Sequence, residues 1–257
     1  MKFIRTAWPV VVLLLALLGA WEIYVDSGGA DPSVLPPPHA IASSVWDNRS
    51  LLWSNFKTTA GAMLLGVLVA SLIGLALAIV MHLVEWLGRA AYPLVIASQT
   101  IPIVMIAPVL VFWLGFGLKP ELVVIALICF FPIVVTTMNA FARVDPELLK
   151  LSRSFDGPRL RVFRHVELPA ALPGVFTGAK IAFAIAAIGA VFAEQSNGST
   201  SGLGYLFELS TNQGLIPLAW ATIVVLSLFT ILLFALLSVA ERMTLPWAYQ
   251  PRGDLSA

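Results

Sequence analysis

Residues 171–193 read ALPGVFTGAKIAFAIAAIGAVFA, with Lys180 as the single charged residue. A membrane helix needs about 20 mainly apolar residues, because its backbone must satisfy its own hydrogen bonds across roughly 30 Å of hydrocarbon. This stretch therefore predicts a membrane-spanning helix. Small residues also recur in it at every fourth position, on one helix face: Gly174, Gly178, Ala182, Ala186 and Ala190. Such a face lets a neighbouring helix backbone approach closely.

The composition extends this interpretation to the whole chain. Of 257 residues, 59% are apolar and only 11% are charged, whereas a soluble domain carries roughly 25% charged residues. Lipid must therefore solvate much of the surface. The chain is predicted to be an all-α membrane protein, one domain over residues 1–257, with about six transmembrane helices. The expected spans are 8–24, 58–82, 91–114, 121–141, 171–193 and 216–240.

The first span has an alternative interpretation. Lys2 and Arg5 precede its apolar run, as in a cleaved signal peptide. The run is long and lacks a clear small-x-small cleavage site, which favours a retained span. Cleavage would leave five spans.

The chain lacks the residues that several classes of function require. A net charge of +1 gives no indication of nucleic-acid binding. Cys129 is the only cysteine, so an intrachain disulfide and a cysteine metal cluster are both excluded. His39 and His82 are isolated in the sequence and are expected to be ordinary interfacial residues rather than metal ligands. We expect no cofactor, no metal and no catalytic set.

Lysine and arginine set the orientation, because they accumulate on the cytoplasmic side. If the N-terminus is inside, eleven lie in inner segments: Lys2, Arg5, Arg89, Arg143, Lys150, Arg153, Arg159, Arg161, Arg164, Arg242 and Arg252. Three lie in outer segments: Arg49, Lys57 and Lys119. Both termini are therefore predicted to be cytoplasmic. Residues 26–57 then form an outer connector, and residues 194–216 an outer loop rich in Gly and Ser.

Prolines interrupt two of the expected spans. Pro102 and Pro108 fall in the third span and Pro132 in the fourth. Each removes an intrahelical hydrogen bond and bends the helix. Such bends suit a transporter, although they also occur in membrane proteins that transport nothing.

The longest inner loop, 142–170, is predicted to hold two short helices. Asp145 is a good N-cap, followed by Pro146 at the first helical position. Pro158 opens the second helix, and Pro169 is expected to end it before the fifth span. The pair could lie on anionic lipid with its arginines facing headgroups, or it could dock a soluble partner. The residues alone leave both possibilities open.

This loop resembles the coupling segment of permeases of ATP-binding-cassette importers. That segment runs Glu-Ala-Ala, three residues, Gly, about nine residues, then a hydrophobe, one residue and Leu-Pro. Leu168 and Pro169 match its end, and Phe163 and Val166 match its apolar positions. Asp156 falls on the Gly position, with Gly157 next to it, and residues 150–152 depart from the Glu-Ala-Ala triplet. This departure leaves open which face meets the ATPase.

The resemblance covers roughly residues 34–247 and is to the nitrate, sulfonate, taurine and thiamine-precursor subfamily. Its motifs here are LPPPHAI, TIPIVMIAPVLVFWLGFG, LPAALPGVFTGAKIAFAIAAIGAVFAE and SGLGYL. It implies a type I importer permease in the bacterial inner membrane. It also implies a homodimer, two ATP-binding subunits and an extracytoplasmic solute-binding protein. The coupling residues would be Asp156, Gly157, Phe163, Val166, Leu168 and Pro169, with Phe163 as the apolar anchor.

Lys180 and Glu194 are the candidates for the translocation path. Lys180 lies roughly 14 Å along its span from Ala171, where an unpaired charge costs at least about 2.5–3.5 kcal/mol. It could line the path, snorkel toward the cytoplasm or pair with a helix carbonyl. Glu194 lies about 21 Å from Lys180 along the helix axis, too far for direct pairing.

The competing hypotheses are an ion-coupled secondary transporter and an intramembrane enzyme. The former would place acidic residues at the midplane, and the latter would need a catalytic set within the spans. The chain contains no Walker A pattern, so ATP hydrolysis is expected on a partner. The expected solute is small and polar: the thiamine pyrimidine precursor, a sulfonate, taurine or nitrate.

Overall fold

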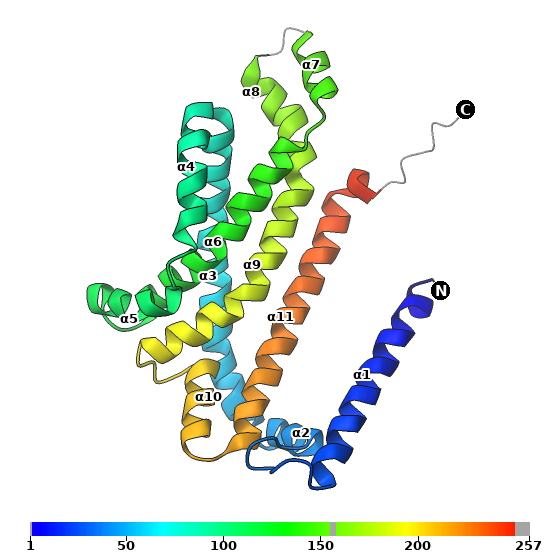
Figure 1. Ribbon diagram of the computed structural model, residues 1–257, viewed down its shortest axis with the longest axis vertical. Helices are drawn as coiled ribbons and strands as arrows, with labels where there is room; N and C mark the ends of the chain where they lie inside the picture. The colour runs from blue at the N-terminus through cyan, green and yellow to red at the C-terminus, as the bar shows by residue number, and fades with distance from the viewer. Residues whose placement is uncertain (1, 155–157, 250–257) are drawn as a thin grey trace. The chain divides into compact units, whose positions relative to one another are not determined.

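The computed structural model describes residues 2–154 and 158–249, whose regular structure is entirely helical (Figure 1). The helices are α1 (Lys2–Asp26), α2 (Pro38–Asp47), α3 (Arg49–Leu83), α4 (Glu85–Ser98), α5 (Ile103–Leu114), α6 (Leu118–Ala142), α7 (Pro146–Ser154), α8 (Arg159–Val162), α9 (Leu168–Ser196), α10 (Leu203–Asn212) and α11 (Ile216–Thr244). A π-helical turn, η1 (Phe163–Glu167), joins α8 to α9, and a 3-10 turn, η2 (Pro246–Tyr249), follows α11. The all-α prediction is confirmed.

Within the part of the chain that the structure describes, five helical segments are long and apolar enough to cross a membrane: Trp8–Asp26, Arg49–Leu83, Leu118–Ala142, Arg159–Ser196 and Ile216–Thr244. The pair α4 and α5 makes a sixth candidate if it counts as one broken span. The predicted number of about six spans therefore agrees with the structure.

The third span differs from its prediction as one helix over 91–114. Its two halves, α4 and α5, meet at a bend of 95°. Pro102 stands directly before α5 and cannot donate a backbone hydrogen bond, so the helix breaks there. Pro108, by contrast, lies inside α5.

The fifth span also differs from its prediction. Pro169 was expected to end the short helix, yet the chain is helical without interruption from Arg159 to Ser196. Pro169 lies in the first turn of α9, where a proline is tolerated because a first-turn N–H lacks a standard α-helical partner. The π-helical turn just before it also changes the hydrogen-bond register.

Packing divides the chain into two compact units, which are described separately. Residues 1–59 and 200–227 contribute to unit 1, and residues 60–199 and 228–257 to unit 2.

In unit 2, α6 and α9 lie side by side, as Figure 1 shows. The small residues of α9 face α6 at close range: a Cβ added at Gly178 would lie 3.1 Å from the Cα of Ile133. The Cys129 thiol donates to the carbonyl of Ala182 over 3.3 Å. The predicted close-packing face of the fifth span is therefore confirmed.

The small residues of α3 pack on α6 in the same way. A Cβ at Gly66 would lie 2.6 Å from the side chain of Ile125, and one at Gly74 would lie 3.1 Å from that of Ile133. Gly61 lies five positions before Gly66 and therefore on a different side of α3, and it has nothing within 4 Å of such a position. The close approach is thus confined to one face of α3.

In unit 1, α10 is held on α3 by two side-chain caps. Asn55 Oδ1 accepts from the N–H of Gly202 at 2.8 Å, and Thr59 Oγ1 accepts from that of Leu203 at 2.7 Å. Gly202 has φ of +123°, which favours glycine. Gly202 thus stands directly before α10, inside the stretch predicted as an outer loop.

His39, expected to be isolated, bonds through Nδ1 to the Glu22 carboxylate and so ties α2 to α1 within unit 1. This hydrogen bond raises the pKa of His39 above its ordinary value. Sequence reasoning missed the pair because the two residues are 17 positions apart.

We expect Gly178→Leu to destabilise the protein, because the larger side chain would force α6 and α9 apart. Overpacking of this kind costs about 1–3 kcal/mol. The thermal unfolding midpoint in detergent should fall. Gly61→Leu, a matched change with open space around it, should leave the midpoint nearly unchanged, and an equal fall in both variants would contradict the packing argument.

Candidate functional site

The 142–170 segment begins with a capped helix. Asp145 Oδ1 accepts from the backbone N–H of Glu147 at 2.8 Å, and α7 starts at Pro146. The predicted N-cap is therefore confirmed. Asp156 and Gly157, two of the predicted coupling residues, lie outside the described residues.

The second half of the segment continues as helix, without interruption, into the membrane helix. Pro158 precedes α8, which runs through η1 into α9. A displacement of α8 therefore acts directly on α9, because no flexible linker separates them.

Phe163, the predicted apolar anchor, is only 6% exposed and packs inside unit 2. Its ring centroid lies 5.7 Å from that of Phe141 on α6 and 6.0 Å from that of His82 on α3. His82 also stacks on Phe141 at 4.3 Å. Leu168, another predicted residue, packs on the same cluster. Phe163 thus anchors the segment to its own subunit.

His82 gives this cluster a polar tie. Its Nε2 bonds to the carboxylate of Glu167, whose side chain is 9% exposed. The pair joins the last turn of α3 to η1. His82 was expected to be an ordinary interfacial residue, and 85 positions separate it from Glu167.

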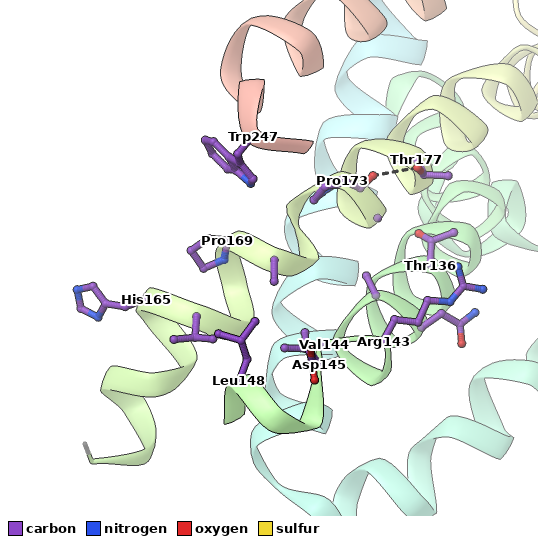
Figure 2. Close-up of a pocket in the computed structure, with 15 residues that line it drawn as sticks. Thr136, Arg143, Val144, Asp145, Leu148, His165, Pro169, Pro173, Thr177 and Trp247 are labelled. Atoms are coloured by element: carbon purple, nitrogen blue, oxygen red, sulfur yellow. Dashed lines mark hydrogen bonds between the residues drawn. The ribbon is translucent and has the colours of Figure 1, made fainter. Parts of the chain in front are cut away.

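The other two described coupling residues, Val166 and Pro169, line a cavity of about 810 Å³ at the same end of unit 2 (Figure 2). We call it the loop cavity. Figure 2 shows Trp247 from η2 near Pro169 and His165, and Arg143 with Thr136 on the α6 side. The cavity thus combines the 142–170 segment with α6, α9 and the chain after α11.

The outer face of the segment is apolar as well as basic. Leu151 and Leu160 are 57% and 66% exposed, whereas Leu148, 50% exposed, lines the loop cavity. Arg159 and Arg161 are exposed beside Leu160. Apolar side chains among cations suit either a protein cleft or an anionic lipid surface.

Lys180 has a partner that sequence reasoning missed. Its Nζ lies 2.5 Å from Glu241 Oε2 on α11 and 5.7 Å from the ring centroid of Phe234. The two charged side chains are 16% and 6% exposed. The phenol of Tyr249, on η2, also bonds to Glu241, and this bond raises the pKa of Tyr249. The 61 positions between Lys180 and Glu241 hid the pair.

Glu194 lies near the other end of α9, where it is 1% exposed. Close by, Asn197 clamps the turn before α6: its Oδ1 accepts from the Gly117 N–H at 3.1 Å, and its Nδ2 donates to the Gly117 carbonyl at 2.8 Å. Glu121 accepts from Asn197 Nδ2 at 2.9 Å and from Ser199 Oγ at 2.6 Å. The amide of Asn197 is therefore structural.

We expect Glu241→Gln to lower stability, because it leaves the Lys180 charge buried without a counter-ion. Breaking a buried pair costs about 3–5 kcal/mol, so the unfolding midpoint in detergent should fall clearly. The double variant Lys180→Met, Glu241→Leu should recover most of the loss. Glu208→Gln, at an exposed position on α10, is the control; a loss in the double variant as large as in Glu241→Gln would refute the argument.

Comparison with known proteins gives consistent matches. The family described as "Binding-protein-dependent transport system inner membrane component" matches residues 62–245. A riboflavin transport system permease protein of Chloroflexus aurantiacus is 34% identical over 248 residues, covering 95% of this chain and 92% of that protein. A formylaminopyrimidine transport permease protein of Halalkalibacterium halodurans is 33% identical, covering 96% and 98%.

A solved structure supports the architecture. A chain of the MetNI methionine ABC transporter in an inward-facing conformation aligns with a TM-score of 0.61 and 18% identity. The alignment covers 80% of this chain and 98% of that one. At this identity the likeness shows the fold alone.

Proposed function

Since this chain belongs to the family of inner membrane components of binding-protein-dependent transport systems, we propose that an ATPase on a separate chain drives it through the 142–170 segment. The resemblance seen over residues 34–247 is thereby confirmed. The chain is a multi-pass inner-membrane permease subunit of an ABC importer for small solutes. This family membership favours ATP-driven import over ion-coupled transport.

The observation that carries the proposal is the mechanical continuity of the second half of the segment. The exposed apolar and basic face of α8 is joined without a break to α9. The same segment is fixed to α3 through the Glu167 and His82 pair. A partner that grips the exposed face would therefore move two membrane helices together, as a rigid-body transition requires.

The coupling residues divide into two roles in this proposal. Phe163 and Leu168 hold the segment to its own subunit, whereas Val166 and Pro169 line the loop cavity. Asp156 and Gly157 keep the docking role that the resemblance implies. Leu151 and Leu160 join the docking face because they are exposed.

The complete importer would contain two copies of this permease, two ATP-binding subunits and one extracytoplasmic binding protein. The family description itself names dependence on a binding protein. Each copy would act as one permease domain, with residues 142–170 and both termini inside, and with residues 26–57 and 194–216 outside.

Lys180 and Glu194 remain our candidates for the path. Lys180 would reach a solute only when its ion pair with Glu241 opens. Glu194 lies near the opposite end of α9, where it would act in gating.

The solute is proposed to be a small polar molecule of the heterocyclic kind, such as the thiamine pyrimidine precursor. The two relatives above are named for riboflavin and for formylaminopyrimidine. The resemblance also allows a sulfonate, taurine or nitrate. Measuring which of these solutes the importer's binding protein binds would decide among them.

Orientation has a direct test. Ser154 and Ser201 are both exposed and are proposed to lie on opposite sides of the membrane. In a Cys129→Ala background, a membrane-impermeant maleimide should label Ser201→Cys in intact cells. It should label Ser154→Cys only after permeabilisation. Labelling of Ser154→Cys in intact cells would place the segment outside and refute the proposal.

Docking has a second test. Leu160→Asp should reduce solute uptake and co-purification of the ATPase by at least about tenfold, because it places a charge in an apolar contact. Leu215→Asp, at an exposed position in the turn before α11, should change neither. Normal uptake and normal ATPase recovery in Leu160→Asp would exclude that contact.

A further inference from the structure

A second cavity lies at the middle of unit 2, and we call it the mid-helix cavity. Its volume is about 780 Å³, within the range of about 300–1,000 Å³ usual for small-molecule sites. It is bounded by the break between α4 and α5, by residues 127–136 of α6, and by Ile181, Ile185 and Ile188 of α9. These residues occupy the central turns of α6 and α9.

From this cavity we infer a subsite on the translocation path for an uncharged heteroaromatic solute. The inference rests on the proposed function, which it narrows to one chemical class. Three observations support it. The backbone is broken between α4 and α5, no charged side chain of the described residues lines the cavity, and the nearby Lys180 is paired with Glu241.

The broken backbone argues that the cavity faces protein, water or solute rather than lipid. Residues 99–102 separate α4 from α5 at mid-unit depth, and Pro102 and Gln99 both line the cavity. The start of α5 has no side-chain cap. Non-helical backbone within a membrane is tolerated only inside protein or beside a water-filled space.

The electrostatics of the break favour a neutral guest. The carbonyl end of α4 and the N–H end of α5 meet there, so the negative end of one helix dipole adjoins the positive end of the other. The break therefore offers both hydrogen-bond acceptors and donors without a field of one sign. Gln99, which is exposed, adds a carboxamide with the same dual character.

The rest of the lining is apolar or uncharged. Of the described residues that border the cavity, none has a charged side chain, and Ser98, Gln99 and Thr136 supply the polar groups. Phe130 and Phe131 contribute aromatic surface beside the aliphatic residues. An anion would lose its hydration here without a compensating charge, whereas a ring with amide-like edges would find apolar walls and a few polar partners.

Lys180 does not change this balance. It is adjacent in sequence to Ile181, which lines the cavity, but its ammonium group is directed to Glu241 on α11. The positive charge at the level of the cavity is therefore neutralised within the subunit.

The first test uses cysteine labelling in the assembled transporter, with Cys129→Ala as background. Ile185→Cys should react with the neutral reagent methyl methanethiosulfonate. We take the rate with the anionic sulfonatoethyl analogue divided by the rate with the neutral reagent. This ratio should be lower at Ile185→Cys than at Ser154→Cys by about tenfold or more, because the cavity excludes an uncompensated anion. Leu232→Cys, exposed on α11 and outside the cavity lining, should react with neither.

The second test uses two rings of similar size as protecting probes. Nicotinamide, which is uncharged, should slow the labelling of Ile185→Cys by the neutral reagent, and benzenesulfonate should not. Replacing Gln99 by Leu should abolish the protection by nicotinamide, because the carboxamide partner is lost.

The outcomes separate this inference from the proposed function. An unreactive Ile185→Cys would assign the cavity to lipid or to a contact with the second copy, and either would overturn the inference. Three results would overturn the assignment of an uncharged solute to this cavity. They are equal reactivity of Ile185→Cys with both reagents, protection by neither ring, and protection by benzenesulfonate equal to that by nicotinamide. Each result is compared with ATP hydrolysis stimulated by the binding protein in the same preparation. Absence of that stimulation in the wild-type transporter would count against the proposed function itself.

Discussion

The close contact between α6 and α9 is the constraint on which unit 2 depends. Glycine at 174 and 178 removes the Cβ atoms that would otherwise collide with Ala140 and Thr136 on α6. Between apolar helices in lipid, such intimate van der Waals packing replaces the hydrophobic driving force that water would supply. Both cavities are lined by α6 and α9, and Thr136 borders each of them. The helix contact therefore positions the loop cavity and the mid-helix cavity together.

The polar side chains that pack between helices find their partners in distant parts of the chain. Lys180 pairs with Glu241, His82 with Glu167, and Asn197 with Glu121. An unpaired polar group is costly in an apolar medium, so each of these residues fixes one helix against another. The His82 and Glu167 pair has a further consequence, because it connects the 142–170 segment to α3. Motion of that segment thus involves more of the subunit than α9 alone.

Much of the architecture followed from the sequence for simple reasons. Long apolar runs with few charges can only be spans, and the number of spans agreed with the structure. Small residues at every fourth position predicted the close face of α9, and Asp145 before Pro146 predicted the start of α7. Prolines were less informative, because the same residue type had different effects. Pro102 stands at a sharp break, whereas Pro132 lies within α6 and Pro169 lies in a continuous helix.

The sequence by itself determined the class of protein, the approximate spans and the family, because hydropathy, spacing and motif order are local properties that lipid and the helix period translate directly into structure. Only the tertiary structure decided which polar residues meet. It paired Lys180 with Glu241 rather than leaving it free in a path, and it buried Phe163 beneath His82 and Phe141. Contacts across 61 or more positions depend on how helices are rotated and packed against one another, and no local pattern in the chain encodes that rotation.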